Sequence, residues 1–390
     1  MRILYLCADR GIPLGGTKGA SAHVRGLIRA LTQLGHEVRV IMGSTADANG
    51  MDVPIVSIPS SLAVDALSNV AEARVARAMN HLLANAEMER ALVEALDSFQ
   101  PDVVYERYSP FAAAGALVCS RLGVPHLLEV NAPLAWEGSR YRRQALSEAA
   151  EELERAAFAA TSCLITVSEE LKDTLVGDGV DASRIVVVPN GVDAELFAPE
   201  GEPSPLNLEG RIVVGFVGSL KPWHGINVLA DGFRKLSADG PYHLLVVGNG
   251  PEQKTIRGLE RDLPDRITHV EAITHDEVPR YIRSMDIAVA PYPDLERFYY
   301  SPLKVLEYMA AGRPVVASAI GQLNDLIETG RTGVLIPPGD TDAFTNAVAK
   351  LADNAELRRA MGAAASDEVR RLHLWTHRAK RIISCTGKAA

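Results

Sequence analysis

The sequence is poor in cysteine and in aromatic residues, and it has no excess of positive charge. Four cysteines occur among 390 residues and no two of them form a C-x-x-C pair; they are Cys7, Cys119, Cys163 and Cys385. This usage predicts buried, reduced thiols in a reducing compartment. The formal net charge of −9 argues against a broad nucleic-acid-binding surface, because phosphate binding needs concentrated positive charge.

Long hydrophobic runs are also absent. The longest uncharged apolar run, FAAAGALVC at 111–119, is far shorter than a membrane span. The apolar stretch ILYLCA is too short for a signal peptide, and Asp9 and Arg10 follow it at once. We therefore expect a cytoplasmic protein. A basic cluster at Arg140–Arg143 leaves a peripheral membrane contact open, although a solvated helix face is the simpler interpretation.

What the sequence does contain is an alternation of short β-branched runs with amphipathic stretches. This pattern predicts parallel β-α-β units, and it runs through residues 1–190. It breaks at 191–210, which is rich in Pro, Gly and Glu and reads as a linker, and it restarts over 211–365 with six expected strands. The predicted fold class is α/β, with two doubly wound, Rossmann-like domains facing each other across a cleft.

The end of the chain predicts one more helix, over about 366–390. Four apolar residues recur there near helical spacing: Val369, Leu372, Trp375 and Ile382. Because the pattern of the second domain is complete before this segment, we expect the helix to pack back on the first domain.

Three loops that follow expected strands have residues suited to a ligand site. The first is DRGIPLGGTKGAS at 9–21, where Gly15 and Gly16 allow the backbone to approach a ligand closely. The order Thr17-Lys18 is the reverse of that in the phosphate-binding loop of nucleoside triphosphatases. The loop also lacks G-x-G-x-x-G, which argues against a nicotinamide dehydrogenase.

The second and third loops add positive charge next to expected helix starts. In GFVGSLKPWHGINVL (215–229), Lys221 and His224 precede a helix, an arrangement that suits a diphosphate. In SPLKVLEYMAAGRPVVAS (301–318), Ser301-Pro302 predicts a helix start and Gly312 its end. Lys304 and Glu307 lie early on that helix, where a surface ion pair is the alternative to a binding role.

Taken together, these loops resemble those of the family-four retaining glycosyltransferases (glycosyltransferases group 1), which have the GT-B fold. The resemblance extends over nearly the whole chain. Its most specific block is LEYMAAGRPVVAS (306–318), and PNGVDAELF (189–197), GNGPE (248–252) and GVLIPPGD (333–340) fall in the expected order.

The resemblance implies a donor site for a nucleotide sugar. The helix start at Ser301–Lys304 would face the diphosphate, and Glu307 would accept hydrogen bonds from the ribose hydroxyls. The segment Val270–Ala272 would lie beside the base. The donor-binding candidates are Gly15, Gly16, Gly218, Ser219, Gly248, Gly250, Tyr299, Ser301, Pro302 and Leu303.

The chain departs from the family pattern at three places. Tyr299 stands where the family usually has a second glutamate, and either Asp294 or Glu296 could supply that carboxylate. Arginine and lysine are replaced by Ser219 and His224, so Lys221 and Lys304 are expected to supply the positive charge. The usual histidine after the fifth strand is Asn131.

The predicted function is transfer of a sugar from a UDP- or GDP-linked donor to a hydroxyl acceptor, with retained anomeric configuration and without a metal or another cofactor. The acceptor could be a small molecule, a glycan or lipid-linked. Two alternatives stay open: an epimerase or phosphorylase of the same fold, and a nucleotide-sugar-binding protein without turnover. The catalytic candidates are Lys221, His224, Lys304, Glu307 and Asn131, and the acceptor candidates are His23, Glu106 and Glu129.

Overall fold

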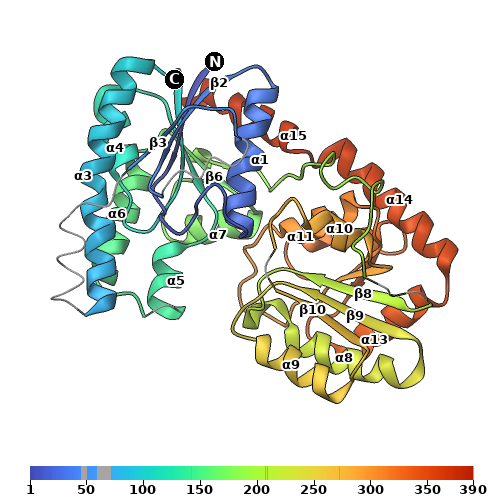
Figure 1. Cartoon of the computed structure of the whole chain (residues 1–390). Coiled ribbons are helices and arrows are strands. Elements are labelled where there is room, and N and C mark those ends of the chain that lie inside the picture. Colours follow the sequence, from blue (N-terminus) through green and yellow to red (C-terminus); the bar gives the residue numbers. More distant parts are fainter. Residues whose placement is uncertain are drawn as a thin grey trace. The chain divides into compact units, whose positions relative to one another are not determined.

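The computed structural model divides the chain into two compact units (Figure 1). It describes residues 1–44, 51–58, 72–141, 143–206, 208, 210–271 and 273–389. The first unit consists of Met1–Gly16, Ala20–Pro189 and Arg378–Ala390, and the second of Thr17–Gly19 and Asn190–His377. Each unit contains one parallel sheet with helices on both faces, so the predicted α/β class with two Rossmann-like folds is confirmed.

The sheet of the first unit has the strand order β3-β2-β1-β4-β5-β6-β7 among the described residues. Its strands are β1 (Arg2–Cys7), β2 (Glu37–Met42), β3 (Ile55–Ser57), β4 (Val103–Arg107), β5 (His126–Val130), β6 (Cys163–Thr166) and β7 (Ile185–Val187). Strands β4 (VVYER) and β5 (HLLEV) are buried along their whole length, so each contains a buried glutamate beside its apolar residues.

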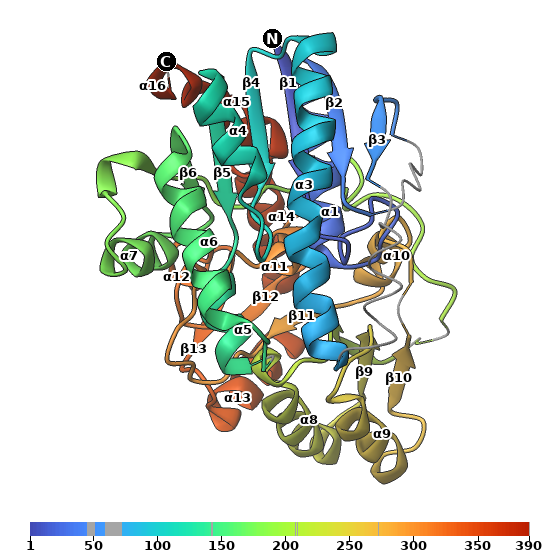
Figure 2. The same ribbon diagram turned by 90° about the vertical axis from the view of Figure 1, so that its left-hand side faces the viewer.

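Helices α3 (Ala73–Phe99), α4 (Ala114–Leu122) and α6 (Ser147–Ala160) lie side by side across one face of this sheet (Figure 2). The unit also contains α1 (Gly19–Gln33), α5 (Leu134–Tyr141) and α7 (Glu169–Gly177). The sequence pattern predicts a helix over 141–160, but α6 begins only at Ser147, because Leu146 adopts a left-handed conformation (φ 58°) just before it. The Ala-, Arg- and Glu-rich stretch 63–98 also predicts helix, and it lies partly outside the described residues.

The sheet of the second unit contains all six expected strands, in the order β10-β9-β8-β11-β12-β13. They are β8 (Ile212–Val217), β9 (Tyr242–Val247), β10 (Ile267–Val270), β11 (Ile287–Ala290), β12 (Val315–Ser318) and β13 (Gly333–Ile336). On one face lie α8 (Ile226–Asp239), α9 (Gln253–Asp262) and α13 (Thr341–Ala352). On the other lie α10 (Val278–Arg283), α11 (Leu303–Ala310) and α14 (Ala355–Leu372), with the short α12 (Leu323–Leu326) nearby.

The chain passes between the units after Pro189 and again after His377. Val192 and Phe197, which fall in the expected linker, are buried in the core of the second unit. The expected last helix is divided, because a β-bridge between Val192 and Leu374 interrupts it. Helix α14 places Val369 in the core of the second unit and leaves Leu372 exposed, whereas most of α15 (Trp375–Ser384) and all of α16 (Thr386–Ala389) group with the first unit.

None of the four cysteines forms a disulfide and all four are buried, as predicted. Burial raises the pKa of Cys7 to about 12. Within the described part of the chain, no helix combines the length and the apolar character that a membrane crossing requires.

One glycine allows a close backbone approach on which the second unit depends. Gly225 precedes α8 with a φ of +71°, and a Cβ atom there would lie 1.7 Å from the carbonyl oxygen of Pro291. We expect Gly225→Ala to lower the free energy of unfolding by more than about 2 kcal/mol, because backbone strain adds to a clash with an immobile carbonyl. Gly258→Ala in α9 is the matched control, since its Cβ would meet only Arg261 at 3.9 Å.

Urea unfolding followed by circular dichroism measures both changes. The control should match the parent or gain up to about 1 kcal/mol from its better helix propensity. Equal midpoints for Gly225→Ala and the parent would contradict the contact.

Candidate active site

The second unit has a topological switch point between β8 and β11. From β8 the chain adds β9 and β10 on one side, and it then returns to add β11, β12 and β13 on the other. The helices that follow the two central strands, α8 and α11, therefore cover opposite faces of the sheet. Parallel sheets bind ligands beyond the carboxyl ends of the strands at such a point, and the loops that contain Lys221, Lys304 and their neighbours follow these two strands.

The glycines after β8 and β9 pack two loops against each other. Gly218 and Gly248 have φ values of +138° and +128°, and a Cβ at Gly248 would lie 2.2 Å from the carbonyl oxygen of Gly218. A Cβ at Gly250 would lie 2.4 Å from the carbonyl oxygen of Leu220. The loops meet here without side chains between them. Of the segment expected beside the base, Val270 ends β10 and accepts a hydrogen bond from Gly248 N at 2.8 Å, whereas Ala272 lies outside the described residues.

Lys304 supplies the central charge of this site. Its Nζ atom lies 4.1 Å from the ring centroid of Phe216 and 5.9 Å from that of Tyr292. Nζ is buried and, among the described residues, has no hydrogen-bond partner. Burial lowers the pKa of Lys304 to about 7, against the opposing influence of Glu307. A buried ammonium without an acceptor is costly, so this arrangement favours the approach of an anion.

The position of Lys304 accounts for the glycine at 218. Lys304 and Glu307 also do not form the surface ion pair that was the alternative to a binding role. A Cβ atom at Gly218 would lie 2.8 Å from Lys304 Nζ, so the glycine leaves room for the ammonium group. The carboxylate of Glu307 accepts instead from His275, whose Nε2 lies 3.0 Å from Oε1. Glu307 is buried, and the His275 ring packs edge-on against Phe197.

His224 lies between two aromatic rings, with centroids 6.3 Å from Phe216 and 5.9 Å from Tyr292. Its Nδ1 donates to the carbonyl oxygen of Ser219. Burial and the nearby Lys304 lower the pKa of His224 to about 3, so the ring is neutral near pH 7. A neutral His224 adds no positive charge to this loop. The second cation is Lys221, whose half-buried side chain places Nζ 5.8 Å from the ring centroid of Trp223.

A hydrogen-bond network holds the start of α11. Asn190 donates through its backbone N to Ser301 Oγ at 2.9 Å and through Nδ2 to the Ser301 carbonyl oxygen at 2.6 Å. Ser301 Oγ in turn donates to Gln322 Oε1 at 2.6 Å. These bonds hold Pro302 and Leu303, where the helix begins and its first amides have no intrahelical acceptor. Ser301 thus positions the helix start through its own hydroxyl.

Tyr299 stands where the resembling family usually has a second glutamate. Its side chain is buried beside Tyr300. The two rings lie 4.6 Å apart, and the Tyr300 hydroxyl donates to that of Tyr299 at 3.4 Å. Both carboxylates considered as substitutes, Asp294 and Glu296, are exposed to solvent in the irregular segment before α11.

In the first unit, the glycine-rich loop is held by a residue that sequence reasoning missed. Arg25 in α1 donates to the carbonyl oxygens of Leu14 and Gly16. Gly16 N donates to the Pro13 carbonyl oxygen at 3.0 Å, and a Cβ at Gly16 would lie 2.5 Å from Ser21 Oγ. Gly15 lies within this turn, so both glycines belong to a fixed loop after β1.

Three further candidates of the first unit, His23, Glu129 and Asn131, concern the carboxyl end of β5. Two of them, His23 and Glu129, are in contact there, together with Arg107. Glu129 lies 2.8 Å from His23 Nε2 and 3.3 Å from an Arg107 guanidinium nitrogen, and all three side chains are buried. Although burial raises the pKa of Glu129, His23 and Arg107 together lower it to about 2, so the carboxylate is ionised. Asn131 follows β5 directly, and its side chain also helps to lower the pKa of Glu129.

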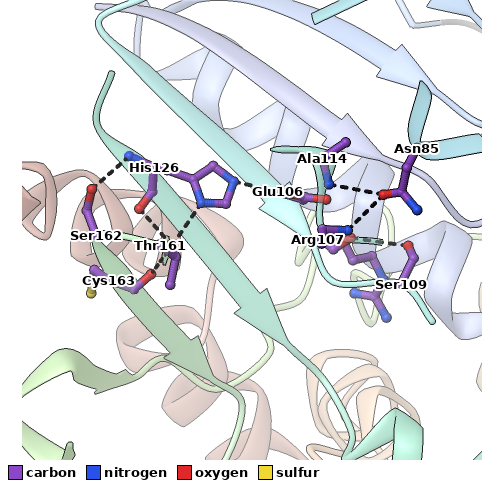
Figure 3. Close-up of polar contacts among 10 residues, drawn as sticks. Asn85, Glu106, Arg107, Ser109, Ala114, His126, Thr161, Ser162 and Cys163 are labelled. Carbon is purple, nitrogen blue, oxygen red and sulfur yellow. Dashed lines mark hydrogen bonds and ion pairs between the residues drawn. The ribbon is translucent and has the colours of Figure 1, made fainter. Parts of the chain in front are cut away.

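Glu106 lies apart from these residues, on the opposite face of the sheet. In the strand register, Arg107 pairs with Glu129 and Glu106 with Leu128, and neighbouring residues of a strand point to opposite faces. Glu106 Oε2 lies 3.0 Å from His126 Nε2, and His126 Nδ1 lies 2.8 Å from Thr161 Oγ1 (Figure 3). Gly115 of α4 packs on this carboxylate, so Glu106 is a structural partner of His126.

In the described residues, no three histidine, cysteine or acidic side chains come together as a metal site. The two sheets have the fold of the GT-B glycosyltransferases. Sucrose-phosphate synthase from Thermosynechococcus elongatus matches this chain with a TM-score of 0.74 and 21% identity, covering 98% of each chain. HepE from Anabaena, solved in complex with UDP-glucose, matches with a TM-score of 0.73 and 19% identity, covering 99% of each chain.

Sequence comparison identifies the family. The Glycosyltransferase Family 4 model matches residues 17–196, and the Glycosyl transferases group 1 model matches residues 211–354. The D-inositol 3-phosphate glycosyltransferase of Stackebrandtia nassauensis is 28% identical over 307 residues, which make up 74% of this chain and 68% of that protein. The chain therefore belongs to the group 1, family-four glycosyltransferases, as its motifs predicted, and it is an enzyme of this class.

The buried ammonium of Lys304 predicts a distinct pH dependence of stability. Because the pKa falls from about 10.4 in the unfolded chain to about 7, the unfolded state binds more protons between these values. Stability conferred by this site should rise with pH from 7 towards 10. Relative to Lys304→Met, the parent should gain roughly 1 kcal/mol per pH unit over pH 7–9 in urea unfolding. The control is Lys235→Met, an exposed lysine that pairs with Asp342, and it should show no such trend. Parallel pH profiles for the parent and Lys304→Met would contradict the burial of the charge.

Proposed function

We propose that this glycosyltransferase moves a sugar from a nucleoside diphosphate sugar to an acceptor hydroxyl with retained anomeric configuration. The observation that carries the proposal is the buried ammonium of Lys304, which has no acceptor among the described residues and lies at the switch point beside the start of α11. A diphosphate would supply the missing anion, and the first amides of α11 would add hydrogen-bond donors.

The donor is a UDP- or GDP-linked sugar. Glu307 suits the ribose because a carboxylate can accept from two neighbouring hydroxyls, and His275 holds it in position through one oxygen. The complexes of Anabaena HepE with UDP and with UDP-glucose support a uridine donor. In this proposal the base lies beside the backbone of Gly248 and Gly250, which have no side chains to obstruct it.

In the proposed reaction, the bond between the anomeric carbon and the diphosphate oxygen breaks and a bond to the acceptor oxygen forms on the same face. The acceptor proton passes to the departing diphosphate. Lys304 and Lys221 stabilise the negative charge that develops on this leaving group, so the reaction proceeds without a metal ion. Glu129 forms ion pairs with His23 and Arg107, so its carboxylate stays ionised and already has two basic partners. It is therefore poorly suited to take the acceptor proton, which supports the leaving group as the proton acceptor.

One observation favours a second candidate, a nucleotide-sugar-binding protein without turnover. A buried tyrosine, Tyr299, occupies the position of the carboxylate that the family directs at the donor sugar. An epimerase or phosphorylase of the same fold would form product without a hydroxyl acceptor. Four buried cysteines, none of them in a disulfide, support a reducing, cytoplasmic setting for the reaction.

The experiment that tests the proposal is a transfer assay with UDP- and GDP-sugars, a panel of hydroxyl acceptors and EDTA. We expect acceptor-dependent release of the nucleoside diphosphate, and proton NMR of the product should show the anomeric configuration of the donor. Lys304→Met and Lys221→Met should each lower turnover by roughly 10–1000-fold, the scale of losing one charge-stabilising donor. A loss below threefold in both variants and in the double variant would contradict this phosphate site.

Glu307→Gln tests the ribose contact separately. The amide replaces one acceptor oxygen by a donor, so binding of the preferred nucleoside diphosphate should weaken by about 1–3 kcal/mol while folding is retained. Glu356→Gln, on the exposed first turn of α14, is the matched control and should bind like the parent. Isothermal titration calorimetry measures both. An unchanged dissociation constant for Glu307→Gln would remove Glu307 from this role.

A further inference from the structure

A small cavity of about 130 Å³ lies wholly within the first unit, at a place that the proposed chemistry does not use. It is bordered by the beginning of α3, by the segment after β4 and by the connection between α5 and α6. Because β4 is parallel to β5, the cavity lies at the same edge of the sheet as Glu129 and Asn131. Its volume is about that of four water molecules at ~30 Å³ each, which suits one small chemical group.

The wall of the cavity is built around a strained aromatic residue. Phe111 has a φ of +64°, which is unfavourable for a bulky side chain. Asn85 holds this conformation, because its Nδ2 donates to the Phe111 carbonyl oxygen at 2.8 Å and its Oδ1 accepts from the backbone of Ala113 and Ala114. Figure 3 shows the Asn85–Ala114 contact. The Phe111 ring stacks on His81, with centroids 6.1 Å apart. Such strain persists where surrounding structure enforces it, and here it places an aromatic face in the cavity.

Three arginines border the cavity and make it strongly positive. Arg74 and Arg77 lie near the beginning of α3, which has no acidic residue in its first turn. Basic residues at a helix N-terminus add to the positive end of the helix dipole, so they cost stability there. Arg143 approaches from the connection after α5, and its own φ is +46°. Among the described residues, Arg74 pairs with Glu72 at 2.7 Å, whereas Arg77 and Arg143 have no carboxylate partner.

A neutral donor completes this lining. Gln144 borders the cavity, and its Nε2 is buried without a hydrogen-bond acceptor in the described part of the chain. A buried amide that lacks an acceptor is costly, as for Lys304 in the second unit. Two guanidinium groups and one buried amide, none of which has a partner of this kind among the described residues, therefore converge with an aromatic wall on a space that fits a single anionic group.

We propose that this cavity is a subsite for a phosphate group carried by a small acceptor. That the bound phosphate belongs to an acceptor rests on the proposed glycosyl transfer, whereas phosphate binding by this cavity does not. Arginine binds phosphate through two parallel N–H donors, and Arg77 and Arg143 approach from different elements, so they can bind different oxygens. The apolar wall formed by Phe111 would contact the carbon atoms next to the phosphate.

The test is calorimetric titration of the full chain at low salt with inorganic phosphate, glycerol 3-phosphate and glycerol. Binding of both phosphates and not of glycerol is expected. Arg77→Gln and Arg143→Gln should each weaken phosphate binding roughly 10–100-fold, and neither change threatens the fold because both side chains are exposed. The matched control, Arg121→Gln, removes an exposed arginine of α4 that pairs with Glu89, and it should leave binding unchanged.

Lys304→Met identifies the unit that binds the probe. Phosphate binding that survives Lys304→Met and is lost in the Arg77→Gln, Arg143→Gln double variant supports the subsite. Phosphate binding lost only in Lys304→Met would overturn it, as would equal affinities for the parent and both arginine variants. Sedimentation with phosphatidylglycerol vesicles separates a lipid source. Vesicle binding that depends on these arginines, without binding of the soluble phosphates, would also overturn the proposal. Because none of these measurements requires turnover, failure of glycosyl transfer would leave their outcome readable.

Discussion

The arrangement around Lys304 in the second unit depends on one close backbone contact, between Gly225 before α8 and the carbonyl of Pro291 after β11. This contact joins the two loops of the topological switch point. The rings of Phe216 and Tyr292 both lie near His224, and the ammonium group of Lys304 lies near the same two rings. If the loops separated, water would reach Lys304 and its pKa would return towards that of an ordinary lysine. The anion binding that we propose for Lys304 therefore depends on how closely these two loops pack.

The buried carboxylates of the first unit and the buried lysine of the second unit differ in whether they have a partner. In the first, Glu129 is held by His23 and Arg107, and Glu106 by His126, so each buried carboxylate has a basic partner. Such groups fix the geometry of the strand ends and have little remaining capacity for a ligand. In the second, Lys304 is left without an acceptor among the described residues. The paired carboxylates stabilise the fold. The buried ammonium of Lys304, which has no acceptor among the described residues, can still gain free energy by binding an anion.

The sheets were predictable from the sequence because strands buried on both faces must be continuous apolar runs, and glycines or prolines end them. The ends of helices and the boundary between the units were harder to predict from the sequence. Leu146 takes a left-handed conformation without being glycine, and the proline-rich segment after Pro189 hides Val192 and Phe197, which anchor it to a core. The candidate residues Lys304 and Glu307 were visible as charges in an apolar helix. Their surroundings were not, because His275 meets Glu307, and Asn190 meets Ser301, only through contacts between residues far apart in the chain.

The burial of all four thiols has a practical consequence for watching this enzyme at work. Thiol reagents attack the thiolate at an accessible sulfur, and Cys7, for example, is both enclosed and held in its protonated form. A single cysteine introduced at an exposed position, such as that of Glu296 in the segment before α11, would therefore be modified almost alone. The natural chain can serve as its own background for site-specific fluorophores or spin labels, with no need to remove native cysteines and disturb the cores they fill.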